Sequence, residues 1–477
     1  MNSVRRLTAL NLAKLLGDWR VSPVRGLTVG LESRLSLLIA EGRIGFGTHL
    51  PPERDLARAL GVSRTTIASA YDSLRASGQL ESRQGSGTWV TAANSEANEN
   101  QTPWHPGGTA KDIDLTHAAF PAPQEITSGL IERAARASAR YTAGHGYHLY
   151  GLPELREAIA RRFTERGLPT GAGQVLVTTG AQGALSLALA LSLAPGGTVL
   201  VEHPTYPHAL SAIRQWGGRC VPVEMGSDGW DYDHWREVAR RNGPAAMYFV
   251  PDFHNPMGLL MSERIRSQLA EICPSSECTM IIDETLVELP MVENLPPPVA
   301  SFADDRSATI TIGSISKVFW GGLRVGWMRA SEHVIAKAVT IKAALDMASP
   351  VLDQLVAVEV MADLPALIEM RRTNLCAARE MMLHSLAAHL PRWRPLFPSG
   401  GLGIWVNIGA QVASRLTEEC RSSGLVIAPG VRFGMNGVFE DHVRLPLTLD
   451  PGIVEQAFSR MAKAWRVVCE TGPDISI

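Results

Sequence analysis

The apolar residues of the first ninety positions recur at helical spacing. A helix predicted over residues 28–41 carries four of them on one face, namely Leu31, Leu35, Leu38 and Ile39. A second predicted helix lies within residues 49–61 and a third within residues 63–78, and each ends at a glycine. Residues 80–90 indicate two short strands around Gly85. Helices followed by a hairpin in this order predict a winged helix-turn-helix.

A different pattern holds from residue 112 to residue 470, where short apolar strands alternate with amphipathic helices. The clearest strands are QVLVTT (174–179), TVLVEH (198–203), AAMYFV (245–250) and TMIIDE (279–284). This alternation predicts an α/β body. Residues 93–111 are rich in Asn, Glu, Gly, Pro and Thr, which is typical of a linker. The sequence therefore predicts a domain over residues 1–92, a linker over 93–111 and a body over 112–470.

Charge is spread unevenly over the 477 residues. Residues 1–92 have a net charge of +5 and the remainder −7, so a basic head precedes an acidic body, which favours a nucleic-acid partner at one end. No signal peptide is evident, and no apolar run approaches the ~18 residues that span a bilayer. The six cysteines lack metal-ligand spacing. We therefore expect a cytoplasmic protein with no membrane association, reduced thiols and no metal.

The third predicted helix begins with side chains suited to DNA. Its positive N-terminus and first residues fit phosphate and base-edge contacts, and these residues are Ser63, Arg64, Thr65 and Thr66. Arg54 precedes them on the second helix, and Arg83 with Gly85 forms a basic wing. An alternative is a protein-interaction domain whose arginines form a solvated face.

Lys317 lies in the segment SISKVFWGGLRVGW, and only six of the 45 basic residues are lysines. A lysine amine can lose its proton and form a Schiff base, whereas a guanidinium stays protonated. Nearby serines and Arg324 suit a phosphate. The segment therefore predicts a pyridoxal 5'-phosphate site, with a chance surface lysine as the alternative.

Other parts of such a site follow the predicted strands. A helix that starts at Gly180-Ala181-Gln182 offers main-chain N–H groups to a phosphate. Tyr206 could stack on the pyridine ring, Asp283 could pair with its nitrogen and Asn255 could bind the 3'-oxygen. Each residue also has an ordinary interpretation, as a core tyrosine, a helix-capping aspartate or a turn asparagine.

Residues 28–90, which include LPPERDLARALGVSRTTIASAYDSLRASGQLESRQGSGTWV, resemble the DNA-binding domain of GntR-type bacterial regulators. The helix, turn and wing segments match in order. The resemblance implies that DNA is contacted by Glu53, Arg54, Ser63, Arg64, Thr65, Thr66 and the wing at Gly85.

The order GAQ, TYP, NPMG, strand-end Asp, SxSK and Arg resembles fold-type I aminotransferases, which have a large and a small domain. The resemblance implies a Schiff base at Lys317 and the ring contacts named above. It assigns the phosphate to Ala181, Gln182, Ser314, Ser316 and Arg324. HVRLPLTL resembles the segment whose arginine, here Arg444, binds a substrate carboxylate. A strand-edge arginine in a surface ion pair is the alternative for Arg444.

Thr285 departs from that family, which usually has a tyrosine at this position to support the 3'-oxygen. Its shorter side chain can still belong to the cofactor site, because the phosphate and lysine contacts dominate binding. The change places efficient transamination in doubt.

A GntR-type head fused to an aminotransferase-like body resembles the MocR branch of GntR regulators. The resemblance implies a homodimer that binds a double-stranded DNA operator. In that branch the head of one chain commonly packs on the body of its partner, a head-to-tail domain swap that the linker is long enough to allow. We expect a regulator that senses pyridoxal phosphate, or a small amine or amino acid, by aldimine exchange at Lys317. Two alternatives are an active aminotransferase that also binds DNA and an aminotransferase whose head binds another protein.

Overall fold

The computed structural model describes residues 6–17, 19, 27–40, 44–45, 47–83, 86–91, 101–102, 105–106, 112–272, 278–303, 308–435 and 437–471. The chain forms two compact units. The first contains Met1–His117, Met381–Pro395 and Trp405–Ile477, and the second contains Ala118–Glu380 and Leu396–Ile404.

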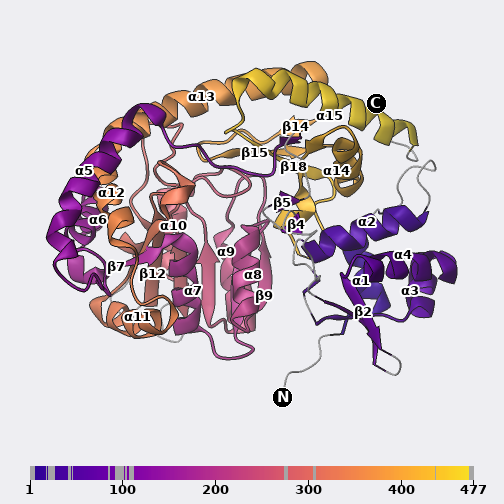
Figure 1. Ribbon diagram of the computed structural model, residues 1–477, viewed down its shortest axis with the longest axis horizontal. Coiled ribbons are helices and arrows are strands. Elements are labelled where there is room, and N and C mark those ends of the chain that lie inside the picture. The colour runs from indigo at the N-terminus through magenta and orange to yellow at the C-terminus, as the bar shows by residue number, and fades with distance from the viewer. Residues whose placement is uncertain are drawn as a thin grey trace. The chain divides into compact units, whose positions relative to one another are not determined.

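The N-terminal part of the first unit combines helices with a small sheet (Figure 1). Its elements are α1 (Ala9–Leu16), α2 (Leu27–Ala40), β1 (His49–Leu50), α3 (Glu53–Leu60), α4 (Arg64–Ala76), β2 (Leu80–Arg83) and β3 (Gly87–Val90). The strands are antiparallel in the order β1–β3–β2. Helices α2 to α4 and the hairpin β2–β3 confirm the predicted winged helix-turn-helix, whereas α1 and β1 were not predicted.

The turn between α3 and α4 is encoded locally. Gly61 ends α3 with a φ of 63°, in the left-handed region that favours glycine. Ser63 then caps α4, because its side chain accepts the Thr66 main-chain N–H at 3.1 Å. The predicted boundary between the two helices is therefore correct.

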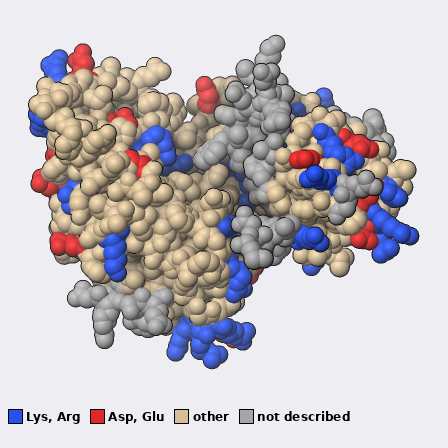
Figure 2. Space-filling model, turned by 60° about the horizontal axis from the view of Figure 1, so that its bottom comes forward, with Lys and Arg blue, Asp and Glu red and all other residues tan. Residues whose placement is uncertain are grey.

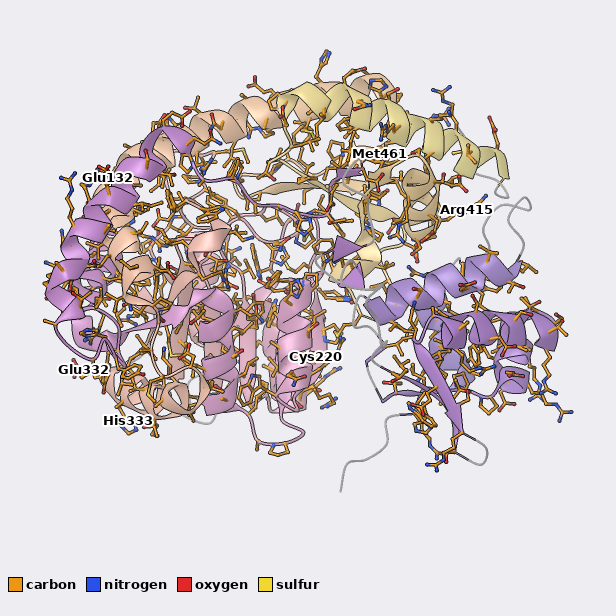
Figure 3. All side chains as sticks on the ribbon, in the orientation of Figure 1. Glu132, Cys220, Glu332, His333, Arg415 and Met461 are labelled. Carbon is orange, nitrogen blue, oxygen red and sulfur yellow. The ribbon has the colours of Figure 1, made fainter. Side chains whose placement is uncertain are left out.

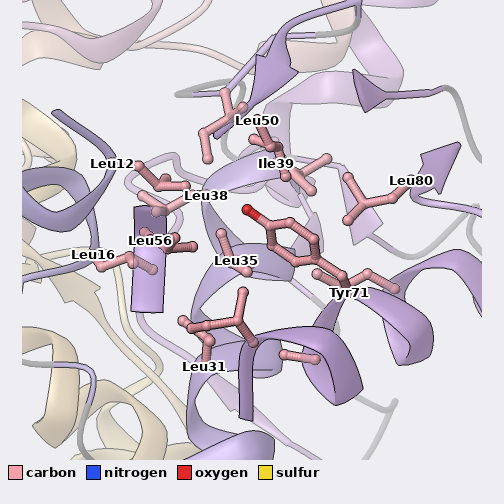
Figure 4. Packing of buried hydrophobic residues seen from close by; sticks show 14 of the residues in the cluster. Leu12, Leu16, Leu31, Leu35, Leu38, Ile39, Leu50, Leu56, Tyr71 and Leu80 are labelled. Carbon is pink, nitrogen blue, oxygen red and sulfur yellow. The ribbon is translucent and has the colours of Figure 1, made fainter. Parts of the chain in front are cut away.

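A leucine-rich core holds these helices together (Figure 4). Leu31, Leu35 and Leu38, from the predicted apolar face of α2, have no exposed surface. They pack in one cluster with residues from α1, α3, α4 and the sheet, among them Leu12, Leu16, Leu56, Tyr71 and Leu80. The cluster buries apolar area that helices of 8 to 14 residues need in order to be stable.

The remainder of the first unit is a small α/β part. Its elements are β6 (Ile113–Asp114), β14 (Arg394–Pro395), β15 (Gly403–Asn407), α14 (Ala413–Ser422), β16 (Leu425–Val426), β17 (Ala428–Pro429), η4 (Gly430–Phe433), β18 (His442–Pro446) and α15 (Pro451–Thr471). Strands β14–β15–β18–β17 form one sheet, and β16 pairs with β6 in parallel. Helices α14 and α15 pack together, and Figure 3 labels Arg415 and Met461 on them.

A buried ion pair joins these two parts of the first unit. Arg34 of α2 places Nη2 3.5 Å from Glu440 Oε1, and both side chains are almost fully buried. Arg34 also donates to the Leu16 carbonyl at 3.0 Å, while Glu440 accepts hydrogen bonds from the main chain and hydroxyl of Ser414. The carboxylate is therefore held at the N-terminus of α14, which carries partial positive charge.

In the described part of the second unit, seven strands form one sheet. They are β7 (Val175–Thr179), β8 (Thr198–His203), β9 (Arg219–Glu224), β10 (Ala246–Phe249), β11 (Thr279–Asp283), β12 (Ala308–Ser314) and β13 (Val325–Arg329). Their order is β7–β13–β12–β11–β10–β8–β9, and β13 is antiparallel to both of its neighbours. The four clearest predicted strands correspond to β7, β8, β10 and β11.

Helices α5 to α12 lie around this sheet, and the long helix α13 follows them in the chain (Figure 1). From residue 124 to residue 389 they are α5 (Gln124–Thr142), α6 (Pro153–Glu165), α7 (Gly180–Ser192), α8 (Pro207–Gln215), α9 (Tyr232–Asn242), α10 (Glu263–Ala270), α11 (Glu332–Leu345), α12 (Val351–Ala362) and α13 (Leu364–His389), with short 3-10 turns η1 (Ala172–Gln174), η2 (Val299–Ser301) and η3 (Gly321–Leu323). Helix α7 packs on β12 and β13, so both the start and the packed face of this predicted apolar helix are fixed by the sheet.

Within the predicted linker, β4 (Gln101–Thr102) and β5 (His105–Pro106) pair as an antiparallel ladder. Cys278 is disulfide-bonded, so the expectation of six reduced thiols is wrong, although Cys220, Cys376, Cys420 and Cys469 are free. Among the described residues, every helix is too short or too polar to cross a lipid bilayer.

Candidate functional site

The carboxyl ends of the parallel strands meet at one edge of the large sheet. Strands β7, β8, β10, β11 and β12 run in the same direction, because β13 reverses between β12 and β7. The residues at or just beyond these ends include Gly180, Tyr206, Asn255, Asp283 and Ser314. Ligands of open α/β sheets bind at this edge. The topology therefore brings together residues that are up to 134 positions apart in the sequence.

Lys317 follows β12 and is half-buried. Its Nζ donates a hydrogen bond to the Ala118 carbonyl at 3.2 Å. The amine is therefore held inside the second unit, which does not fit the alternative of a chance surface lysine.

Close approach of main chains shapes the start of α7. A Cβ atom on Gly180, whose φ is 69°, would lie 2.5 Å from Arg324 Nη2. A Cβ atom on Gly326 would lie 2.4 Å from the Gly180 carbonyl carbon and 2.5 Å from the Ala181 nitrogen. The Arg324 guanidinium and the first N–H groups of α7, those of Ala181 and Gln182 among them, therefore lie together. This combination suits a phosphate dianion.

Ser314 and Ser316 are buried and form a small network with β13. Ser314 Oγ lies 2.8 Å from the Val325 carbonyl and 2.9 Å from Ser316 Oγ, and it accepts the Ser316 main-chain N–H at 3.1 Å. The two serines therefore fix the loop that carries Lys317. Their predicted phosphate contacts stay predictions.

Asp283 ends β11 and is 6 % exposed. Its Oδ2 accepts the Tyr248 hydroxyl at 2.7 Å, and its Oδ1 accepts the Thr285 main-chain N–H at 3.0 Å. Burial raises the pKa of Asp283, and the hydrogen bonds from Tyr248 and Thr285 oppose that rise. Such a carboxylate, buried at the sheet edge, suits a protonated ring nitrogen. Tyr248 was not anticipated from the sequence.

The other predicted ring contacts lie at the same edge. Tyr206 precedes α8 and makes an edge-on contact with His208, with 5.3 Å between the ring centroids. Asn255 is half-buried in the segment after β10. Thr285 directs its main-chain N–H to Asp283, so it supports the carboxylate. The roles of these three residues toward the cofactor stay predictions.

Arg371 of α13 is a second residue that sequence reasoning missed. It is 4 % exposed and donates to the carbonyls of Val318 at 2.8 Å, Phe319 at 2.9 Å and Pro121 at 3.1 Å. Its guanidinium carbon lies 4.1 Å from the centroid of the Phe120 ring. Arg371 therefore ties the segment after Lys317 to the segment whose Ala118 accepts the Lys317 hydrogen bond.

Arg444 lies on β18 of the first unit. It is 7 % exposed, donates to the Thr116 carbonyl and has its guanidinium carbon 5.5 Å from the centroid of the Phe433 ring. Burial lowers its pKa, and repulsion from Arg432 adds to this effect. Within the described residues its Nε has no hydrogen-bond partner, and attraction by Asp114 opposes the lowering of its pKa. The alternative of a surface ion pair therefore does not fit, and a buried cation of this kind suits a ligand carboxylate.

Most of the predicted DNA-binding residues lie on α3 or at the start of α4, and Arg83 ends β2. Ser63, Arg64 and Thr65 are exposed, and Arg64 Nε donates to Glu53 Oε2 at 3.2 Å. The remaining described residues of the set are Thr66, which is half-buried, and Arg54 and Arg83, which are exposed. Gly85 lies outside the described residues. Figure 2 shows basic groups interspersed with acidic ones on the visible face, so on that face charge alone does not mark out a DNA surface.

The residues at the sheet edge fit pyridoxal phosphate. A Cβ atom on Gly180 would clash with the Arg324 guanidinium, a buried carboxylate ends β11, and a lysine amine follows the neighbouring strand β12. These are the groups that the phosphate, the ring nitrogen and the aldehyde of the cofactor require.

Comparisons with known proteins agree with this arrangement. Residues 111–461 match the family model "Aminotransferase class I and II", and residues 27–90 match "Bacterial regulatory proteins, gntR family". The chain is 26 % identical to the uncharacterized HTH-type transcriptional regulator YdfD of Bacillus subtilis, over 82 % of this chain and 86 % of the relative. It is 30 % identical to the probable rhizopine catabolism regulatory protein MocR of Rhizobium meliloti, over 62 % of this chain and 64 % of that protein.

A solved structure has a similar fold. The α-aminoadipate aminotransferase LysN of Thermus thermophilus, complexed with N-(5'-phosphopyridoxyl)-L-leucine, superposes with a TM-score of 0.69 at 28 % identity, and covers 75 % of this chain and 92 % of that one. The fold-type I expectation is thereby confirmed. The chain belongs to the aminotransferase class I and II family and, with its N-terminal GntR domain, is a transcriptional regulator of the GntR/MocR type.

Proposed function

We propose that this regulator binds pyridoxal phosphate at Lys317 and uses the site to sense an amine or amino acid. The observation that carries the proposal is the convergence of Lys317, the glycine-lined start of α7 and buried Asp283 at one sheet edge, in a chain that also has a GntR head. An enzyme gains little from being held at one DNA locus, whereas a sensor must be held there.

Each residue has a task in this proposal. When bound, pyridoxal phosphate supplies an aldehyde that condenses reversibly with primary amines. Arg324 and the N-terminus of α7 hold the phosphate, and Asp283 holds the ring nitrogen. In the described structure Lys317 Nζ donates to the Ala118 carbonyl, and an amine that takes the place of Lys317 on the cofactor would leave the lysine amine available for this hydrogen bond. Arg444 binds the carboxylate of an amino-acid ligand.

Arg444 gives a route from the ligand to the head, because it lies in the same compact unit as the DNA-binding residues. A ligand that binds one arrangement of that unit more tightly than another shifts the population toward it. We propose a homodimer as the functional state, so that two heads read two half-sites of an operator. A head-to-tail exchange of domains belongs to the same proposal.

A second candidate function is an active aminotransferase that also binds DNA. Matches to the family model over residues 111–461 and a full set of candidate cofactor residues favour it. Thr285 argues against efficient turnover. It occupies the position at which a tyrosine hydroxyl usually supports the 3'-oxygen of the cofactor, and its main-chain N–H is directed to Asp283.

Spectroscopy of the full chain supplied with pyridoxal phosphate tests the first proposal. The wild type should absorb above 320 nm and yield a borohydride-reducible adduct at Lys317, and Lys317→Ala should lose both. Arg64→Ala should weaken operator binding and leave the spectrum unchanged, because Arg64 is an exposed residue of the head.

The two candidate functions, sensor and enzyme, predict different responses of the protein to added amines. A sensor should show a saturable spectral shift with a set of amino acids and no multiple-turnover formation of keto acid. Sustained keto-acid formation would favour the enzyme. A wild-type protein that stays colourless and forms no lysine adduct would refute both.

A further inference from the structure

Tyr248 of β10 is a buried tyrosine whose hydroxyl is directed at Asp283, the proposed partner of the ring nitrogen. It has no exposed surface, and its hydroxyl lies 2.7 Å from Asp283 Oδ2. Strands β10 and β11 are parallel neighbours in which Tyr248 is paired with Ile281, two residues before Asp283. Two hydrogen-bonded strands therefore fix the positions of both partners, so the contact is part of the sheet.

The direction of this hydrogen bond follows from the environment. Burial raises the pKa of Tyr248 well above its usual value, and the nearby Asp283 carboxylate raises it further. The phenol therefore keeps its proton and donates a hydrogen bond to the carboxylate. Asp283 accepts at Oδ2 from Tyr248 and at Oδ1 from Thr285, so both oxygens are oriented before any ligand binds.

The Asp283 carboxylate would otherwise sit in an unfavourable place for a charge. Burial disfavours its ionised form, and Glu202 of β8 acts in the same direction. Besides burial, the groups with the largest effects on the Asp283 pKa are Tyr248, Thr285 and Glu202, while Tyr206 also acts on Tyr248. Of these groups, Tyr248 is the one that donates a side-chain hydrogen bond to Asp283 from a neighbouring strand, β10.

We infer that Tyr248 is a positioning residue that orients the Asp283 carboxylate and keeps it charged, so that the cofactor's ring nitrogen stays protonated. The inference rests on the proposed pyridoxal phosphate site and adds a residue to it. It assigns a role to a tyrosine that would otherwise be an ordinary core residue with a satisfied hydroxyl.

Tyr248→Phe removes only the hydroxyl and keeps the ring that packs in the sheet. Full-length protein would be loaded with pyridoxal phosphate labelled with 15N in the ring, and the ring-nitrogen chemical shift would be followed against pH. In the variant, the loss of the ring proton should occur at a pH about one unit lower than in the wild type, because a hydrogen bond to a charged group typically has this effect. Cofactor affinity should fall about tenfold, while the borohydride-reducible adduct at Lys317 should still form.

Two further variants separate positioning from folding. Tyr71→Phe is a matched control, because Tyr71 is a buried tyrosine of the head whose hydroxyl donates to the Pro51 carbonyl at 3.1 Å. It should leave the ring-nitrogen titration unchanged. In an Asp283→Asn background, Tyr248→Phe should produce no further change, since the hydroxyl acts through the carboxylate.

The possible results distinguish a failure of the inference about Tyr248 from a failure of the proposed function. A normal Lys317 adduct together with a titration that moves by less than about 0.3 units in Tyr248→Phe would overturn the inference and leave the proposed function intact. An equal shift in the Asp283→Asn background would also overturn it. A wild type that forms no adduct would refute the proposed function, and the inference with it.

Discussion

Gly326→Ala should damage the start of α7 more than its single methyl group suggests. Gly326 lies on β13, where it pairs with Thr178 on one side and Ser314 on the other. A Cβ atom there would lie 2.4 Å from the Gly180 carbonyl carbon and 2.8 Å from the Gly180 oxygen. Carbon atoms in ordinary contact are about 3.5–4.0 Å apart, so the main chains would have to separate by roughly 1 Å.

No small rearrangement can bring about that separation of the main chains. The obstructing atoms belong to the main chain of α7, and β13 is held in the ladder on both sides. Overpacking of this kind typically costs about 1–3 kcal/mol, and we expect about 3 kcal/mol here. In the cofactor-free protein this corresponds to a fall of about 6 °C in the midpoint of thermal unfolding. Because the N–H groups of α7 would move, affinity for pyridoxal phosphate should fall about 10- to 100-fold.

Gly321→Ala is the matched control, because a Cβ atom on Gly321 would meet nothing within 4 Å. It should stay within about 0.5 kcal/mol of the wild type and bind the cofactor normally. Thermal unfolding without cofactor and an absorbance titration with it would give both quantities. Equal tolerance of the two substitutions would refute the close approach on which the phosphate site is built.

Three further changes have predictable outcomes. Arg166→Met should lower the free energy of unfolding by about 3–5 kcal/mol in chemical denaturation, because it leaves the buried Glu284, which Arg166 pairs with at 2.6 Å, without its ion-pair partner. Arg133→Met, at a half-exposed side chain, should lower it by less than about 1 kcal/mol. Similar losses in the two variants would contradict the reasoning. Burial raises the pKa of Asp283, so its contribution to the stability of the cofactor-free protein is complete below about pH 4 and is lost as pH rises through the raised value. Asp283→Asn should therefore gain thermal stability relative to wild type as pH increases from about 4, and a gap independent of pH would count against this. Ser63→Ala should cost about 1 kcal/mol in thermal unfolding through loss of the α4 cap, with Ser63→Asp, which restores a capping acceptor, close to wild type.

Much of the fold could be predicted from local sequence patterns. The leucines of α2, the glycine that ends α3 and the apolar strands β7, β8, β10 and β11 each depend on residues close together in the sequence, and each was predicted correctly. Helix α1 and strand β1 were missed because they are short, and they exist through packing and pairing with distant residues.

The candidate site divides in the same way. Lys317, Asp283 and Arg324 stand in recognisable segments, so the sequence could nominate them. Tyr248 and Arg371 could not be found, because their partners are 35 residues away for the first and 52, 53 and 250 for the second. Only the order of the strands and the packing of α13 bring these groups to their places.

The ion pair between Arg34 and Glu440 has a consequence for engineering. A GntR head grafted from another regulator would place a foreign side chain opposite Glu440, and an apolar one would leave that carboxylate buried and uncompensated. Chimeras that recombine heads and bodies should therefore keep arginine at position 34 or replace Glu440 in the same step. The head and the body can be exchanged between regulators only if both partners of this ion pair are kept or replaced together.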